Sequence, residues 1–325
     1  MQMFDKVHKQ QVNTPGELLN QWQMFEDCPG IYNAWDIVKT YKNHQINFDG
    51  WSNITVVEDG PISVAIRMEK SFSKSRAVQV VRLYANSPRV DFETWVDWNE
   101  KEKLLKVAFP VNVKARTYST DTSAGVMERM NNKNTTWEQA RFEVPCHKWV
   151  DMSEGMFGVS ILNDCKYGCD VEENVIRLSL LKAPIRPDRT SDLGTHYFTY
   201  SIYPHGPSGI AEGLVESAYQ LNQPAPVYTG RKLTVAEGVV MENTSSALKV
   251  QAFKLAEDGS NDVILRLTEV YGSHGTAQIK LPFAIESAME CDLMENVQRA
   301  VPYVEDTLEV AYAPNQIISV RMKRK

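Results

Sequence analysis

The stretch Asp91-Phe-Glu-Thr-Trp-Val-Asp-Trp98 alternates between apolar or β-branched side chains and acidic ones. In an extended chain, Phe92, Val96 and Trp98 point to one side, while the acidic residues between them point to the other. A period of two is typical of a β-strand that buries one face in a core and leaves the other in water. The sequence therefore predicts a half-buried strand over residues 91–98.

The same alternation recurs at residues 176–181, 263–268 and 318–322. Residues 263–268 carry apolar side chains at both parities, so we expect this strand to be covered on both faces. Turn-forming groups of Gly, Pro, Asn and Asp separate the predicted strands. One short helix is predicted, at residues 211–221, where leucines recur at helical spacing. Many short strands between such turns predict an all-β protein built from sandwiches.

A stretch rich in proline and glycine, between Gly206 and Ala236, gives the best domain boundary. Such a composition favours an exposed connection between two folded units. A chain of 325 residues is long enough for two domains. We therefore predict a large β domain at residues 1–225 and a smaller β-sandwich at residues 226–325.

The net charge and the cysteine content limit the classes of binding partner and the cellular compartment that we expect. The formal net charge of −6 disfavours a nucleic-acid partner, because phosphate binding needs a basic surface. Five cysteines form an odd, sparse set rather than a disulfide framework, which predicts a reducing, cytoplasmic compartment. The sequence shows no secretory signal and no run of about 18 or more apolar residues, so no membrane partner is expected.

A dense series of polar and aromatic motifs occupies residues 128–205. In order, it contains Glu128-Arg129, Asn134-Thr-Thr-Trp137, Ala140-Arg-Phe-Glu-Val-Pro145, Leu162-Asn-Asp-Cys-Lys-Tyr-Gly168, Leu178-Ser-Leu-Leu-Lys-Ala-Pro184 and Phe198-Thr-Tyr200. Further motifs lie upstream, at Phe25-Glu-Asp27 and Ala34-Trp-Asp36, and downstream, at Leu281-Pro-Phe283. The series resembles the C-terminal region of the α-mannosidases of glycoside hydrolase family 38, most closely their cytosolic and bacterial branch. The resemblance extends over nearly the whole chain.

This resemblance implies a fold and a division of labour. The fold would be a large supersandwich of the galactose-mutarotase-like kind, followed by a small β domain. Family members carry the aspartate nucleophile, the acid/base and the zinc ligands in an N-terminal catalytic module, which this sequence lacks. We therefore expect no catalytic residue and no cofactor in this chain, with zinc in the catalytic module of the parent.

The expected function follows from the same resemblance. The chain would be the C-terminal β region of an enzyme that hydrolyses α-mannosides with retention. It would pack on the catalytic module, line part of the sugar cleft and be inactive alone. A homo-oligomer is a further possible partner, since members of the family are often oligomeric.

The loop Asn163-Asp-Cys-Lys-Tyr-Gly168 is the strongest local candidate for substrate binding. It follows an apolar run, Asn-Asp favours a turn, and Gly168 permits a positive φ. In the functional interpretation Asp164, Lys166 or Tyr167 reaches the sugar cleft. In the structural interpretation Asp164 only satisfies backbone amides of the turn. Polar clusters on loops serve both purposes, so the sequence leaves both open.

Lys182 and Arg129 complete the predicted substrate-binding residues. Lys182 follows a buried run, where a cation can pair with a buried acid or donate to sugar hydroxyls. Family members commonly carry an arginine at the matching place, and lysine lacks the bidentate fork of arginine. Arg129 lies in the same motif region as Trp137 and forms a third group of candidates with it. For Trp137, core packing is favoured over sugar stacking.

No metal site is expected in this chain. Cys165 and Cys169 are four residues apart and Cys146 adjoins His147, but no Cys-x-x-Cys or His-x-x-x-His pair completes a tetrahedral set.

Two other classes of function stay open. A free-standing carbohydrate-binding β-sandwich would use aromatic side chains such as Trp137 or Trp149 as stacking platforms. A mutarotase-like enzyme would need an acid beside His147, His196 or His205 in an open cleft, and the spacing of these histidines does not favour one. A sizeable exposed apolar patch would indicate a region that normally packs on a partner.

Overall fold

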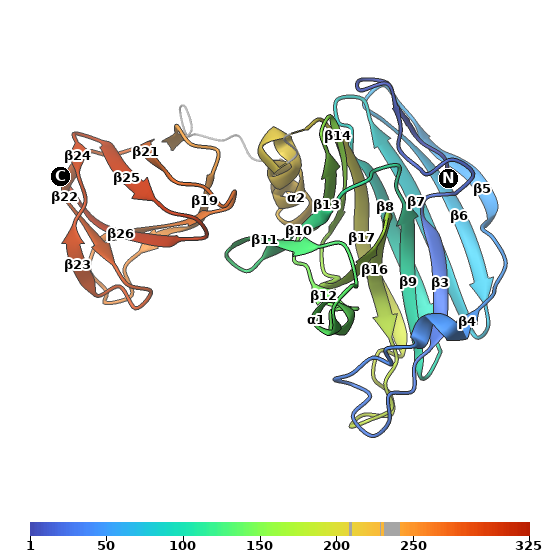
Figure 1. Cartoon of the computed structure of the whole chain (residues 1–325). Helices are drawn as coiled ribbons and strands as arrows, with labels where there is room; N and C mark the ends of the chain where they lie inside the picture. Colours follow the sequence, from blue (N-terminus) through green and yellow to red (C-terminus); the bar gives the residue numbers. More distant parts are fainter. Residues whose placement is uncertain (208–209, 228, 231–240) are drawn as a thin grey trace. The chain divides into compact units, whose positions relative to one another are not determined.

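The computed structural model describes residues 1–207, 210–227, 229–230 and 241–325. The protein is all-β, with two sandwiches and few helices (Figure 1). The chain divides into two compact units. Unit 1 comprises Met1–Asp121 and Glu128–Pro224, and unit 2 comprises Thr122–Met127 and Ala225–Lys325.

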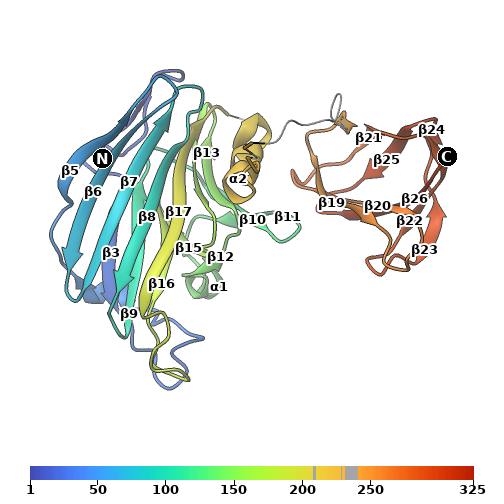
Figure 2. The ribbon, with the colours of Figure 1, turned by 180° about the vertical axis from the view of Figure 1, so that it is seen from behind.

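Two large sheets build unit 1, apart from the few residues of β10 and β11 that belong to unit 2. The nine-stranded sheet has the order β11 (Gly125–Met130), β10 (Thr117–Thr122), β13 (Trp149–Glu154), β14 (Phe157–Asn163), β17 (Gly194–His205), β8 (Val90–Trp98), β7 (Ser75–Tyr84), β6 (Ser63–Phe72) and β5 (Ser52–Asp59). The six-stranded sheet has the order β12 (Val144–Pro145), β15 (Gly168–Glu172), β16 (Val175–Lys182), β9 (Lys103–Pro110), β3 (Gln21–Glu26) and β4 (Gln45–Ile46). A small hairpin of β1 (Phe4–Asp5) and β2 (Gln10–Gln11) precedes them. Strands β5, β6, β7, β8 and β17 of the nine-stranded sheet lie side by side in Figure 2.

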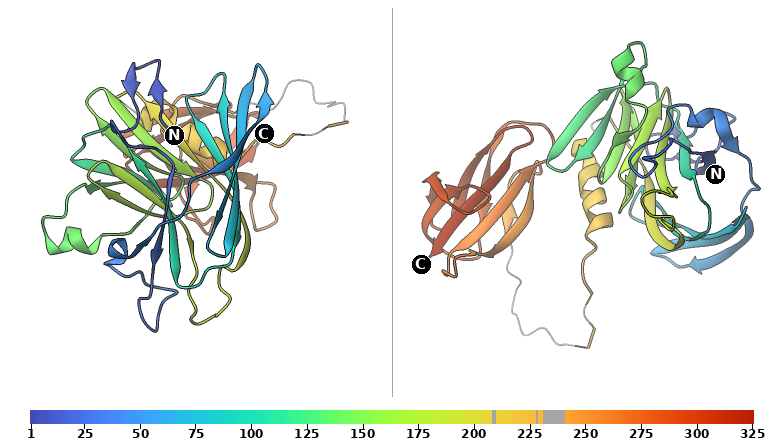
Figure 3. Two further views of the ribbon diagram at one scale, coloured as in Figure 1. Left: turned by 90° about the vertical axis from the view of Figure 1, so that its right-hand side faces the viewer. Right: turned by 90° about the horizontal axis from the view of Figure 1, so that it is seen from below.

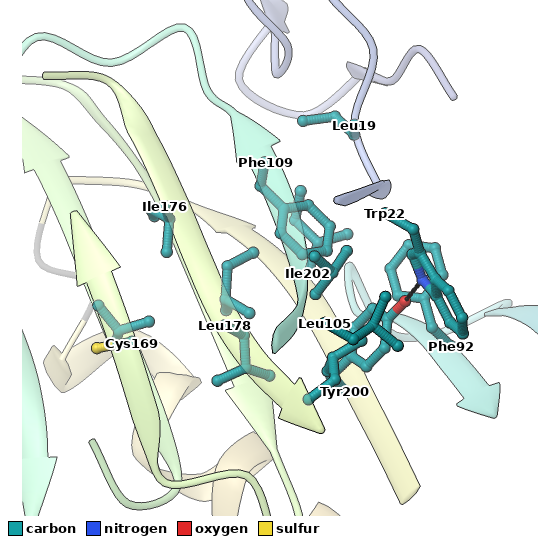
Figure 4. Close-up of a cluster of buried hydrophobic side chains, with 14 of the residues drawn as sticks. Leu19, Trp22, Phe92, Leu105, Phe109, Cys169, Ile176, Leu178, Tyr200 and Ile202 are labelled. Carbon is teal, nitrogen blue, oxygen red and sulfur yellow. Dashed lines mark hydrogen bonds between the residues drawn. The ribbon is translucent and has the colours of Figure 1, made fainter. Parts of the chain in front are cut away.

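The core of unit 1 lies between these two sheets. Phe92 and Tyr200 come from the nine-stranded sheet, and Trp22, Phe109 and Leu178 come from the six-stranded one (Figure 4). The buried Tyr200 hydroxyl accepts a hydrogen bond from the Trp22 indole nitrogen at 2.9 Å, so the two sheets are joined by a polar contact inside the apolar core. Burying a hydroxyl is tolerated here because its hydrogen bonds are made.

Unit 2 is a smaller sandwich around its own core. Its four-stranded sheet has the order β18 (Glu242–Asn243), β21 (Gly275–Lys280), β25 (Thr307–Tyr312) and β24 (Tyr303–Val304). Its five-stranded sheet has the order β19 (Leu248–Leu255), β20 (Val263–Glu269), β26 (Ile317–Arg324), β22 (Ile285–Cys291) and β23 (Val297–Ala300).

The strands predicted from alternation are confirmed. Phe92, Val96 and Trp98 of β8 are fully buried on one face of the sheet. The expectation that residues 263–268 are covered on both faces is also confirmed, since the successive residues Ile264 and Leu265 of β20 are both fully buried.

The helices differ in part from the prediction. The helix expected at residues 211–221 forms as a π-helical turn, Ile210–Leu214, that continues into α2 (Val215–Asn222), which lies against β14 (Figure 3). A 3₁₀ turn, Tyr41–His44, and a short helix, α1 (Thr136–Ala140), were not predicted. The α1 helix begins with a capping box, in which Thr135 and Glu138 satisfy each other's backbone amides.

The domain division from the sequence, residues 1–225 and 226–325, stays a prediction. It did not anticipate that residues 122–127 belong to unit 2. Part of the proline- and glycine-rich stretch on which it rested, residues 208–209, 228 and 231–236, lies outside the described residues.

No helix in the described part of the chain combines the length and apolar character that a membrane span requires.

Candidate functional site

The turn between β14 and β15 carries three of the predicted substrate-binding residues. Asn163, at the end of β14, donates from its amide to the His147 carbonyl at 2.7 Å and accepts from the Lys166 backbone amide at 2.8 Å. Asp164 accepts from the Thr199 backbone amide at 2.9 Å through its Oδ2 atom. Asp164, which the functional interpretation places in the sugar cleft, therefore uses its carboxylate to connect the turn to β17.

Lys166 and Tyr167 differ in how far they reach solvent. The Lys166 ammonium lies 4.6 Å from the centre of the Phe198 ring, and burial lowers the pKa of this half-buried lysine. Tyr167 is 53% exposed, with its ring centre 5.4 Å from that of His147. Among the three predicted residues of this turn, Tyr167 is thus the one that presents its side chain outward.

Gly168 ends this turn for a reason other than the predicted one. Its φ is not among the positive values found in the described residues, so left-handed backbone is not what the position requires. A Cβ atom here would come within 2.9 Å of the Glu143 carboxylate. Glycine at this position leaves room for the partly buried side chain of Glu143.

Lys182, at the end of β16, pairs with the carboxylate of the buried Asp27. The other oxygen of Asp27 accepts from the Val38 backbone amide at 2.9 Å. The ion pair therefore connects β16 to the segment that follows β3. Of the two roles that the sequence allowed for Lys182, pairing with a buried acid is the one observed.

Arg129, on β11, borders a small cavity with Tyr118, Lys133, Glu138 and Arg141. The cavity has a volume of about 20 Å³, which suits roughly one water molecule. The Nε atom of Arg129 is buried without a hydrogen-bond partner in the described structure.

The predicted substrate-binding residues lie on three elements, namely the turn between β14 and β15, the end of β16, and β11, and they do not form one cluster. Because β15 and β16 run antiparallel, the turn before β15 and the end of β16 lie at the same end of the six-stranded sheet. Arg129 borders its cavity together with Val171, which lies further along β15. Their assignment as substrate-binding residues stays a prediction.

A buried charge network that the sequence did not reveal lies on the face of the six-stranded sheet turned away from the sandwich core. Lys106 of β9 is fully buried, and its Nζ atom lies 2.7 Å from Asp170 Oδ2 and pairs with Glu143. Asp170 also accepts from Lys42 Nζ at 2.9 Å and from Arg177 Nη1 at 3.1 Å.

The network fixes the charge states of its members. Burial alone would raise the pKa of Asp170, but the cations Lys106, Lys42 and Arg177 lower it well below its usual range. Burial would lower the pKa of Lys106, but the carboxylates of Asp170 and Glu143 raise it. The available signal in the sequence was a single lysine inside the apolar run Leu104–Pro110, which needs a buried partner.

The histidines weighed for a mutarotase-like site are now placed. Nε2 of His205 lies 2.7 Å from Asp151 and 3.1 Å from the Ser160 hydroxyl, but His205 is almost fully buried. His196 contacts the Asp192 carbonyl at 2.7 Å. A buried His–acid pair is no open catalytic cleft.

The two tryptophans considered as sugar platforms have opposite environments. Trp149 is 1% exposed, so it cannot stack on a ligand. Trp137, for which core packing was favoured, projects from α1 and is 77% exposed. None of the residues of α1 is buried, so the prediction that Trp137 packs in the core is wrong.

The zinc ion that the resemblance implies for the parent enzyme finds no ligand set in the described part of this chain. There, no group of three or more His, Cys, Asp or Glu residues is arranged to hold a metal ion. All five cysteines are free, and Cys146, Cys169 and Cys291 are buried.

Comparison with known families places the chain. The model of the "Glycosyl hydrolases family 38 C-terminal domain" matches residues 1–190, which is more than half of the chain. The chain belongs to glycoside hydrolase family 38. The model of the family's "C-terminal beta sandwich domain" matches residues 247–320, within unit 2.

Known relatives show which part of a family 38 protein this chain resembles. Human alpha-mannosidase 2C1 is 34% identical over 320 residues, which cover 94% of this chain and 30% of the relative. Alpha-mannosidase G of Dictyostelium discoideum is 34% identical over 308 residues, covering 90% of this chain and 28% of the relative. The chain thus spans about 30% of the length of these relatives and corresponds to their C-terminal domains.

Solved structures show the same fold. The crystal structure of an alpha-mannosidase from Enterococcus faecalis aligns with a TM-score of 0.80 over 99% of this chain and 40% of that protein, at 16% identity. The two-sandwich architecture is therefore that of the family.

Proposed function

We propose that this chain is the C-terminal β region of a retaining α-mannosidase. The match of two family 38 C-terminal domains, in their family order, carries this proposal. Under it, an upstream module supplies the nucleophile, the acid/base and the zinc ligands, and the substrate is an α-mannoside. This region packs on that module and borders the sugar cleft.

The charged candidates divide into two roles under this proposal. Asp164 and Lys182 hold segments together, through the Thr199 amide and the Asp27 carboxylate, so they position the wall of the cleft. Tyr167, exposed beside His147, is the side chain of this turn best placed to contact a sugar hydroxyl or ring face. Free cysteines throughout fit a cytoplasmic parent enzyme.

Hydrolysis of an aryl α-mannoside with added zinc tests the proposal. The assay compares this chain alone with the reading frame extended upstream. Turnover by the extended protein only is the expected result. Turnover by this chain alone would mean that it holds a complete catalytic site, contrary to the proposal.

A carbohydrate-binding module is the second candidate, because aromatic side chains are exposed. Tyr32 and Trp35 lie on the loop after β3, with ring centres 6.4 Å apart, and both are largely solvent-exposed, as is Trp137. Saturable binding of mannosides by this chain, lost in the Trp35→Ala variant but kept in Trp149→Phe, would favour this function. Trp149→Phe is the control because Trp149 is buried.

A further inference from the structure

A row of aliphatic side chains leaves the core of unit 1 along β6 and β7. Along one face of β6, exposure rises from 3% at Phe72 and 7% at Met68 to 37% at Ile66 and 42% at Val64. On β7, Val81 is 4% exposed, while Leu83, two residues further on, is 45% exposed. The residues of each strand share one face, because side chains alternate with a period of two. The face that is buried at one end of the strands is therefore uncovered at the other.

Cross-strand pairing makes these exposed residues one surface. Val64 lies opposite Leu83, and Ile66 lies opposite Val56 of β5. Directly opposed residues of antiparallel strands point to the same side. Val56 is 68% exposed. We call Val56, Val64, Ile66 and Leu83 the β5–β7 apolar row.

The row borders a free sheet edge and a groove. Among the strands that the structure describes, β5 is the outermost of the nine-stranded sheet and pairs with β6 alone (Figure 1). Leu83 also lines a groove of about 490 Å³ together with Phe4 and Val7 of the N-terminal hairpin region, both of which are exposed. Aliphatic side chains next to an open edge are a recognised association surface, and soluble proteins usually protect such edges.

We propose that the N-terminal part of the parent enzyme packs on the β5–β7 apolar row. The inference rests on the proposed function, under which an upstream module belongs to the same polypeptide. The relatives are more than three times as long as the region they share with this chain, so a large module is available to cover the row. The match to the C-terminal domain model places that module upstream of the shared region.

Geometry favours this occupant over a second copy of the chain. Under the proposed function the upstream module is joined at the N-terminal side of residues 1–190, and Phe4 and Val7 lie on the groove that the row borders. A module tethered there is present at a high effective concentration next to the row.

Reaction of introduced cysteines with a maleimide tests the proposal. The background carries Cys28→Ser and Cys165→Ser, because these two native thiols are exposed. Val56→Cys and Ile66→Cys report on the row, and Ser71→Cys is the matched control on the opposite face of β6. Each variant is made in this chain alone and in the reading frame extended upstream.

The expected result is a fall in labelling rate of about tenfold or more for the two row cysteines in the extended protein, with little change for the control. Equal rates in the two proteins would overturn the proposal. Protection in the short chain that grows with its concentration would assign the row to a second copy instead. Hydrogen exchange at the β5 amides, measured on both unsubstituted proteins, gives the same answer without any variant.

Aryl α-mannoside turnover by the extended protein is measured in parallel. Protection of the row without turnover would leave the docking surface standing and remove the proposed activity. Turnover without protection of the row would support the proposed activity and overturn the docking surface.

Discussion

Replacing Lys106 by methionine tests how much the buried charge network stabilises unit 1. Methionine keeps an unbranched chain of similar volume and removes the ammonium. Asp170 retains Lys42 and Arg177, whereas Glu143 keeps the Ser179 hydroxyl and loses its cation. The cost therefore arises mainly at Glu143, whose side chain is 15% exposed and pairs with no other cation in the described part of the chain.

The expected magnitude follows from that environment. Removing one partner of a buried ion pair costs about 3–5 kcal/mol, and we expect the lower end, about 3 kcal/mol, because Asp170 stays compensated. This free energy corresponds to roughly a hundredfold change in the unfolding equilibrium. With a urea m-value of about 3 kcal/mol per M, the unfolding midpoint of unit 1 falls by about 1 M.

Tryptophan fluorescence can follow this transition selectively. All seven tryptophans lie at or before residue 149 and within unit 1, so unfolding of unit 2 is silent in this signal. Lys103→Met is the matched control on the same strand. Lys103 lies 3.5 Å from the exposed Glu26, and an exposed ion pair contributes at most about 1 kcal/mol. A midpoint for Lys106→Met equal to that of the control would refute the argument that this network stabilises unit 1.

Two further predictions concern a glycine and an acid. Gly158→Ala would place a methyl group on the His205 ring, so we expect about 1–3 kcal/mol of destabilisation by the same fluorescence assay. Gly155→Ala meets nothing within 4 Å and should change stability by less than about 0.5 kcal/mol, and equal effects would contradict the steric reason. In unit 2, burial raises the pKa of Glu269, but amide donors that include Asn315 lower it below 4.5 overall. Its contribution to stability is thus complete above pH 4.5 and is lost as the pH falls. Glu269→Gln should lower the free energy of unfolding of unit 2 by about 2 kcal/mol at neutral pH. The variant should also lose less of its circular dichroism signal as the pH falls. An acid transition identical to that of the unsubstituted protein would mean that other groups cause it.

Local patterns were enough to predict the strands. Phe92 to Trp98 alternate because one face of β8 is in the core, and this information lies within eight residues. The capping box of α1, Thr135 with Glu138, was equally local and could have been read from the sequence.

The candidate site was harder to predict, because its interactions join distant segments. Lys106 pairs with Glu143, 37 residues away, and Asp170 receives the Tyr41 hydroxyl from a distance of 129 residues. The sequence likewise left the role of Asp164 open, because its partner, the Thr199 amide, lies on β17. Only the sheet order brings such residues together.

Residues 122–127 limit where this protein can recombine with a homologue. They belong to unit 2, where the Val126 amide donates to Asn315 Oδ1 at 2.9 Å and Gly125 leaves space for the same side chain. Unit 2 consequently comprises two separated parts of the chain, although both sheets of its sandwich lie in the second part. Recombination at a single point near residue 225 would exchange the sandwich of unit 2 but keep residues 122–127 from the other parent, opposite a loop of different sequence. Homologous chimeras should therefore tolerate such a crossover only where residues 122–127 and the loop around Asn315 have come from the same parent.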